Sequence, residues 1–248
     1  MPEAKSVEAL VVGGAPSGDA DRVVHLLTAE GRLAVFAPQA KRSRRRFAGA
    51  LEPFTTIEAQ LAAQKKRAGL PTLADATVRR ARLALRRDLS TIALASYFSE
   101  LGFRTAPEGQ ITDVTTLVEA AWDRLLTEPA TRRLRRAFEL RLMAELGYAP
   151  ELDRCVACGV EPDQGFVDLV RGGLLCAIHR GASIRVGPKT LHWLRAVLSA
   201  SNLDESGGVD AQWAETAATK CTGPFVAFFE SLMSRPLNAT KLLAEVDL

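Results

Sequence analysis

The sequence predicts an α+β protein in which a β-rich N-terminal part is followed by a helical part that contains a short cysteine-rich segment. Up to about residue 78, short apolar runs rich in β-branched residues alternate with turns, which is typical of a β-sandwich or small barrel. Beyond that point apolar residues recur at helical spacing. Residues 151–185 show neither period and hold three of the four cysteines. With 248 residues, the chain can form two or three small domains.

Turn residues delimit the expected strands of the N-terminal part. The first β-branched run reaches Gly13-Gly14, where we expect the strand to end in a turn. Pro53 is expected to bend a later pair of strands, because proline cannot continue a hydrogen-bonded ladder. Strands are therefore expected over 7–12, 22–27, 33–37, 50–60 and 70–73.

Helical periodicity dominates the rest of the chain. The clearest helix lies over 113–127, where Asp113 is the expected N-cap and Pro129 follows the end. A long helical stretch near the C-terminus is expected to be interrupted at Gly223-Pro224. Helices are expected over 83–98, 113–127, 131–146, 188–198 and 209–233.

Charge is distributed unevenly along the chain, although the total is only +3. The first 100 residues have a net charge of +6, and residues 151–248 have a net charge of −3. This asymmetry indicates a polyanionic partner for the N-terminal part, with solvated surface charge as the alternative. No apolar run approaches the roughly 18 residues of a membrane helix, and the N-terminus lacks a secretory signal pattern. We therefore expect a cytoplasmic protein with no membrane association.

Two pairs of potential metal ligands lie in the cysteine-rich segment. Two residues separate the ligands within each pair, so both side chains of one turn can reach a single ion. Residues 159–175 connect the pairs, a spacing typical of a zinc ribbon. Gly159 permits the tight turn after the first pair. We predict one structural Zn²⁺ with no open coordination position, held by Cys155, Cys158, Cys176 and His179.

Signatures of catalysis are missing from the sequence. It contains no GxxxxGK[ST] phosphate loop, no HExxH and no zinc-deaminase pattern. Histidines 25 and 192 are better explained as structural residues, and Cys221 as a buried core thiol. We expect a protein that is not an enzyme and has no catalytic residues.

Several segments together resemble the bacterial recombination and repair protein family RecO. Residues 138–159 (FELRLMAELGYAPELDRCVACG) match its most recognisable stretch, and 172–176 (GGLLC) match the approach to the second ligand pair. Upstream, 21–24 (DRVV), 43–54 (SRRRFAGALEPF) and 97–101 (YFSEL) are also similar. Zinc-binding members usually have a fourth cysteine where this sequence has His179. Because histidine is a competent zinc ligand, we expect the metal to be retained.

The resemblance implies an N-terminal OB-fold β-barrel over 1–79, an α-helical domain over 80–152 and 186–248, and a zinc-ribbon insertion over 153–185. It implies a DNA repair and recombination role: binding single- and double-stranded DNA, annealing complementary strands, and helping RecA, together with RecR, onto DNA coated by single-strand binding protein. It also implies contact with the acidic C-terminal tail of that binding protein, and a cytoplasmic, nucleoid-associated location. The rival hypothesis is a regulator or RNA-binding protein with an OB-fold and a zinc ribbon but no repair role.

Clustered arginines supply candidate DNA contacts. Such clusters bind phosphates without reading bases. For the second cluster, and for a third that comprises Arg132, Arg133, Arg135 and Arg136, a solvated helix face is the alternative. The predicted DNA-binding residues are Lys41, Arg42, Arg44, Arg45 and Arg46 in a first cluster, and Arg79, Arg80, Arg82 and Arg86 in a second.

Overall fold

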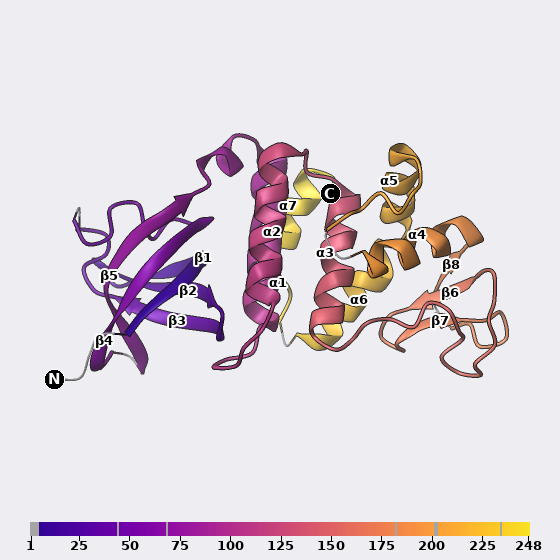
Figure 1. The fold of residues 1–248 in the computed structure, drawn as a ribbon, viewed down its shortest axis with the longest axis horizontal. Coiled ribbons are helices and arrows are strands. Elements are labelled where there is room, and N and C mark those ends of the chain that lie inside the picture. Colours follow the sequence, from indigo (N-terminus) through magenta and orange to yellow (C-terminus); the bar gives the residue numbers. More distant parts are fainter. Residues whose placement is uncertain (1–4, 44, 68, 182, 201–202, 234) are drawn as a thin grey trace. The chain divides into compact units, whose positions relative to one another are not determined.

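The computed structural model describes residues 5–43, 45–67, 69–181, 183–200, 203–233 and 235–248 (Figure 1). The chain divides into two compact units, one formed by residues 1–128 with 241–246 and the other by 129–240 with 247–248. No helix within the described residues is long and apolar enough to cross a membrane.

A closed five-stranded barrel begins the first unit. Its strands are β1 (Lys5–Ser17), β2 (Asp21–Thr28), β3 (Gly31–Ala37), β4 (Thr55–Arg67) and β5 (Leu70–Ala81). They follow the order β1-β2-β3-β5-β4, and β4 closes the barrel against β1. All pairs are antiparallel except β3 and β5, which meet in parallel at Phe36 and Thr72. Inward-facing apolar side chains such as Val24, Leu26, Val35 and Ile57 are fully buried, which confirms the predicted N-terminal barrel.

Two strand predictions were wrong in detail. β1 does not end at Gly13-Gly14 but continues to Ser17 through a bulge between Val11 and Gly13. A Cβ on Gly14 would lie 2.4 Å from the carbonyl oxygen of Val23, so this glycine permits close strand approach instead of a turn. The expected strand pair over 50–60 is a single strand, because β4 begins only at Thr55 and Phe54 has a positive φ of 68°.

Two helices pack against the barrel within the same unit. A short 3₁₀ turn, η1 (Leu83–Arg86), precedes α1 (Leu89–Thr105) and α2 (Val114–Thr127). Phe103 of α1 stacks on His25 of β2 with ring centroids 4.5 Å apart. The hydroxyl of Thr115 donates to the carbonyl of Thr28 at 2.7 Å. Asp113 occupies the N-cap position of α2, although its side chain makes no capping hydrogen bond.

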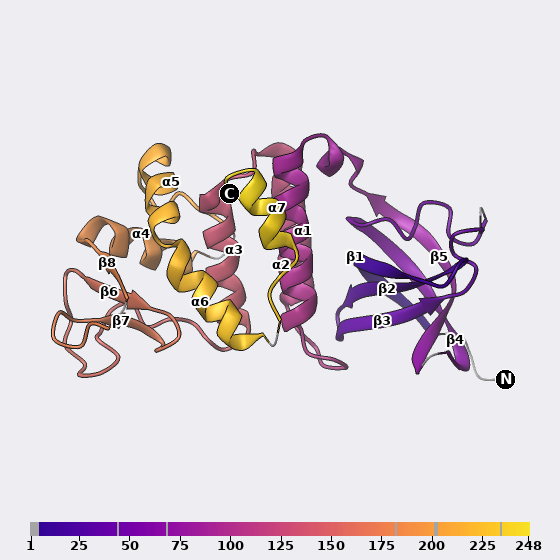
Figure 2. The same ribbon diagram turned by 180° about the vertical axis from the view of Figure 1, so that it is seen from behind.

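The second unit combines helices with a small sheet (Figure 2). Its helices include α3 (Arg132–Glu145), α4 (Pro188–Ser199), α5 (Ala211–Lys220) and α6 (Thr222–Leu232), and α7 (Ala239–Glu245) follows them in the chain. Between α3 and α4 the chain forms β6 (Gly165–Asp168), β7 (Gly173–Leu175) and β8 (Ile184–Val186), in the order β7-β6-β8.

The predicted helix break at Gly223-Pro224 was wrong by two residues. Helices α5 and α6 meet at Cys221, and Pro224 lies inside the first turn of α6. Proline is tolerated there because the first N–H groups of a helix have no intrahelical acceptor. The buried side chain of Cys221 confirms the prediction of a core thiol, and burial raises its pKa to about 11.

Charged side chains are buried inside the second unit. Arg136 and Glu139 are fully buried neighbours on α3 and form an ion pair. Arg135 also donates to Glu139, at 3.0 Å, and Arg136 lies 4.7 Å from the ring centroid of Phe225. A solvated helix face was therefore the wrong interpretation for these two arginines.

Candidate metal centre and nucleic-acid interface

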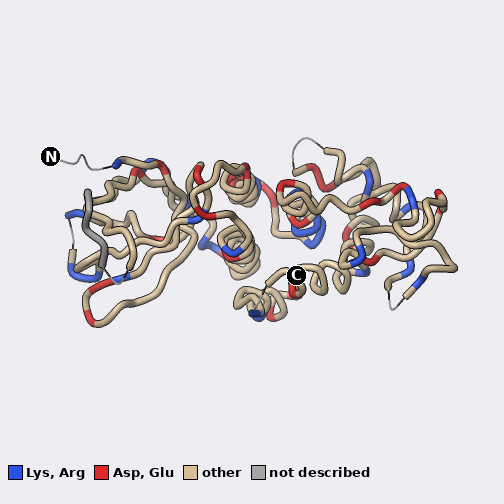
Figure 3. The backbone as a smooth tube through the Cα atoms, turned by 90° about the horizontal axis from the view of Figure 1, so that it is seen from below, with Lys and Arg blue, Asp and Glu red and all other residues tan. Residues whose placement is uncertain are grey.

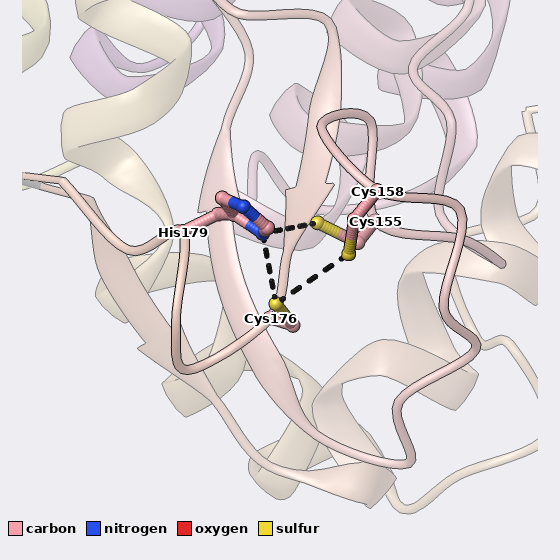
Figure 4. Close-up of side chains that lie close together, drawn as sticks. All are labelled: Cys155, Cys158, Cys176 and His179. Carbon is pink, nitrogen blue, oxygen red and sulfur yellow. Dashed lines mark hydrogen bonds between the residues drawn. The ribbon is translucent and has the colours of Figure 1, made fainter.

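Three cysteines and one histidine converge in the small sheet and the two turns beside it (Figure 4). The ligand atoms of Cys155, Cys158, Cys176 and His179 all lie within 4.8 Å of one another. The first pair lies on a turn in which Gly159 has a φ of +76° and donates to the carbonyl of Cys155. The second pair follows directly after β7, and His179 N–H donates to the carbonyl of Cys176 at 3.1 Å.

The separations between these atoms fit one tetrahedral ion. Cys158 Sγ and Cys176 Sγ are 3.9 Å apart. His179 Nδ1 lies 3.2 Å from Cys176 Sγ and 3.7 Å from Cys155 Sγ. Tetrahedral Zn²⁺, with bonds of about 2.3 Å to sulfur and about 2.05 Å to nitrogen, would separate two sulfurs by about 3.8 Å and a sulfur from a nitrogen by about 3.6 Å. The cluster can therefore bind a metal ion, with Nδ1 as the histidine donor.

Backbone amides stabilise negative charge on the sulfurs of Cys155 and Cys176. At Cys158 the N–H of Val160 acts in the same direction, but burial and the sulfurs of Cys155 and Cys176 outweigh it and raise the pKa of this thiol. Burial of Cys155 opposes ionisation, but N–H groups of Cys176, Ala157 and Cys158 outweigh it and lower the pKa of this thiol to about 6. The N–H of His179 likewise lowers the pKa of Cys176. Hydrogen bonds to Cys176 and Cys155 raise the pKa of His179. Thiolates are the form that binds metal.

The first cluster of predicted DNA contacts lies on the loop between β3 and β4. Lys41, Arg42, Arg45 and Arg46 are exposed, whereas Arg44 lies outside the described residues. Figure 3 marks the backbone positions of Lys and Arg in blue and those of Asp and Glu in red. Phe47, Ala50 and Leu51 anchor the loop in the barrel core. The loop thus has a fixed base and presents its positive charge to solvent.

The second cluster is engaged in contacts within the first unit. Arg79 forms an ion pair with Glu58, and Arg80 donates to Asp123 at 2.6 Å. Arg86 donates to the carbonyl of Pro53 at 2.9 Å. The side chains of Arg79 and Arg80 nevertheless remain about half exposed, at 57% and 51%.

Arg82 has a different environment from the rest of its cluster. Its side chain is fully buried and lies 5.5 Å from the ring centroid of Trp122. The guanidinium donates to Glu119 and Asp123 of α2, both at 2.6 Å, and to the hydroxyl of Thr56 at 2.9 Å. The structure therefore encloses this predicted DNA contact between β4 and α2 and does not present it to solvent.

A further basic run was missed in the sequence. Lys65, Lys66 and Arg67 end β4, and β5 begins at Leu70, so the run belongs to the β4–β5 hairpin. Loops between strands of OB-folds commonly bind nucleic acid. The signal that could have singled out this run as a candidate nucleic-acid contact is three consecutive cations between the expected strands over 50–60 and 70–73.

Comparison with known proteins places relatives along nearly the whole chain. The family model described as "Recombination protein O N terminal" matches residues 1–82, and "Recombination protein O C terminal" matches residues 86–220. The DNA repair protein RecO of Anaeromyxobacter sp. (strain K) is 38% identical over 239 residues, covering 92% of this chain and 91% of that protein. That of Geobacter metallireducens is 32% identical over 251 residues, covering 99% of each chain. That of Pelobacter propionicus is 40% identical over 175 residues, covering 69% of this chain and 70% of its own.

Proposed function

Because the chain belongs to the RecO family of DNA repair proteins, we propose that it binds single- and double-stranded DNA and anneals complementary strands. We further propose that, together with RecR, it helps RecA onto DNA coated by single-strand binding protein, and that it contacts the acidic tail of that protein. The family is one of recombination mediators that are not enzymes. Relatives over the full length favour this role over that of a regulator without a repair function.

The exposed basic loop is the observation that carries the DNA-binding proposal. Its cations project from a base anchored by Phe47, and Arg46 lies 5.1 Å from the centroid of that ring. Phosphate contacts of this kind are independent of base sequence. Aromatic residues make up only 6% of the chain, so few bases can stack on the protein. Binding dominated by charge suits a protein that must bring two strands together and then release them.

Replacing Arg44, Arg45 and Arg46 with alanine is expected to weaken single-strand binding equally for all sequences. Loss of three phosphate contacts at about 0.7 each should reduce the slope of log affinity against log salt by about two. Fluorescence anisotropy across a salt series measures this slope. The matched control is Arg79→Ala with Arg80→Ala, which removes two exposed arginines that already have carboxylate partners. A larger change in the control would transfer the main DNA site to the second cluster.

Annealing is expected to proceed without ATP. Two polyanions need only charge screening and a bound state that lets bases pair, and the basic loop supplies the screening. The rate at which two complementary oligonucleotides anneal should rise with protein, be unaffected by ATP, and fall as salt screens the cations. The same assay with strands coated by single-strand binding protein tests the mediator role. Dependence on ATP, or cleaved or deaminated products, would contradict the proposal.

We propose that Zn²⁺ occupies the cluster of Cys155, Cys158, Cys176 and His179. Four protein donors would leave no position for substrate, so the metal would crosslink the two ligand turns and do no chemistry. The three thiolates and one neutral imidazole give the loaded site a formal charge of −1. The metal would therefore fix the conformation of the small sheet.

A further inference from the structure

Charge is sharply divided within the sequence around the metal cluster. Residues 151–168 contain five carboxylates and one arginine. Residues 169–203 contain five cations and no carboxylate at all. Within the ribbon itself, residues 153–168 form an acidic half with four carboxylates and one arginine, and residues 169–185 form a basic half with three arginines and no carboxylate, although the net charge of the ribbon is zero. Such a division is invisible in the charge of the whole C-terminal part, which is negative.

Two cations of the basic half flank an aromatic ring on the small sheet. Phe166 of β6 is directly paired with Arg185 of β8, so their side chains lie on the same face of the sheet. Arg180, from the turn after the second ligand pair, lies 5.9 Å from the ring centroid of Phe166. Both arginines are exposed and Phe166 is partly exposed. We call these three residues the Phe166 face.

The cations of this face have no carboxylate partners among the residues that the structure describes. Arg185 donates only to the amide oxygen of Gln164, at 3.3 Å. In the acidic half, by contrast, Arg154 pairs with Glu161 at 3.0 Å. One carboxylate, Asp168, lies on the same strand two residues from Phe166, and it accepts a hydrogen bond from the backbone N–H of Arg171. The Phe166 face thus retains positive charge that its own ribbon does not neutralise.

The ligand cluster adjoins this face, because Leu175 is the direct cross-strand partner of Phe166. Phe166 packs against the buried group of Cys155, Leu175 and Cys176. The side chain of Arg171 donates to the carbonyl of His179 at 3.1 Å, which ties the β6–β7 turn to the second ligand pair. The ring of Phe166 and the turn that carries His179 and Arg180 are therefore both joined to the ligand cluster. A site whose parts are positioned in advance loses less conformational entropy when it binds a ligand.

We propose that the Phe166 face is a second contact for single-stranded DNA, separate from the basic loop of the barrel. Guanidinium planes and aromatic rings both stack on unpaired bases, and arginine also binds the adjacent phosphates. The inference rests on the proposed DNA-binding function and extends it. An annealing protein must hold two strands, and a chain with one contact in each compact unit has a place for each of them.

Photocrosslinking locates this contact in the full-length protein. The probe is an oligothymidylate carrying 5-iodouracil, and the crosslinked peptides are identified by mass spectrometry. A crosslink in the peptide containing Phe166 is expected in the wild type and in the barrel-loop variant Arg45→Ala with Arg46→Ala. It should be lost in Arg180→Ala with Arg185→Ala. That variant should also bind about tenfold more weakly at low salt, with a salt slope lower by about 1.4 for two lost contacts.

The matched control is Arg154→Ala, which removes an exposed arginine from the acidic half of the same ribbon. Its crosslinks and salt slope should equal those of the wild type, and equal zinc content in all variants shows that the ribbon is intact. Crosslinks confined to the barrel, with an unchanged slope in Arg180→Ala with Arg185→Ala, would overturn the inference but leave the proposed function standing. The inference would also be overturned if an oligoglutamate peptide, but not oligothymidylate, protected Arg180 and Arg185 from an arginine-modifying reagent. The Phe166 face would then bind an acidic protein and not DNA. Failure of the wild type to bind any single strand would instead refute the proposed function.

Discussion

Removal of the proposed zinc ion is expected to unfold residues 153–185 while the first compact unit stays folded. The three strands of the ribbon contain only four, three and three residues. Its buried group consists of Cys155, Leu175 and Cys176 with partly buried Phe166. A segment this small cannot bury enough apolar surface to fold unaided. Structural zinc contributes an apparent binding free energy of about 10–16 kcal/mol, which becomes folding free energy.

Cys158→Ser is the sharpest variant for this test. Cys158 is exposed, so its replacement removes a ligand without opening a cavity in a core. Elemental analysis of protein purified without added metal should find about one zinc per chain in the wild type and much less in the variant. Hydrogen exchange over 153–185 should become rapid, as it should after chelation. Cys221→Ala, which alters a thiol outside the cluster, should retain the metal. Slow exchange in a zinc-free ribbon would show that the metal is not what folds it.

Arg82→Ala is expected to destabilise the first unit by about 2–3 kcal/mol. Breaking a buried ion pair commonly costs about 3–5 kcal/mol. We expect a smaller loss of stability than this because Glu119 and Asp123 are about one-third exposed, at 35% and 34%, and water can solvate them once the arginine is gone. Loss of the cation over Trp122 adds to the effect. Urea unfolding followed by hydrogen exchange of peptides from β4 and α2 assigns the change to this unit.

Arg80→Ala is the matched control for Arg82→Ala, because both arginines bind the same Asp123. Arg80 is half exposed, so its removal should cost less than about 1 kcal/mol. Arg82→Lys should remain destabilised, since an ammonium cannot donate simultaneously in the three directions that the guanidinium serves. Equal effects of the two alanine variants would mean that burial of Arg82 contributes nothing to stability.

Features that depend on neighbouring residues could be predicted from the sequence. The convergence of the four candidate ligands follows from two short spacings, and the structure brings all four side chains together. The helix over 113–127 was clear because its apolar side chains share one face, and α2 has nearly these bounds. The turn predicted at Gly13-Gly14 was wrong because glycine is typical of both turns and bulges. Only the close approach of Val23 in the folded sheet distinguishes the two.

The roles of the arginines could not be predicted, because their partners are distant in the sequence. Arg82 and Arg45 both belong to basic runs, yet the side chain of Arg82 is fully buried and that of Arg45 is exposed. The difference arises from Glu119 and Asp123, which a helix 37 and 41 residues further along brings to Arg82. A solvated face was the alternative for Arg136, but in the structure this residue pairs with Glu139 and lies over the ring of Phe225. Pairing of β6 with β8, which places Arg185 beside Phe166, is likewise a property of the folded sheet.

Assignment of residues 241–246 to the same compact unit as residues 1–128 has a consequence for how the protein is made. A ribosome delivers the barrel and helices α1 and α2 long before it delivers this segment, in which Leu243 is 1% exposed. The first unit therefore lacks this segment until the whole second unit has been synthesised. A fragment that stops at residue 128 would lack the segment as well. Nascent chains of increasing length, probed by limited proteolysis, should gain full resistance in the barrel unit only when residues 241–246 have emerged.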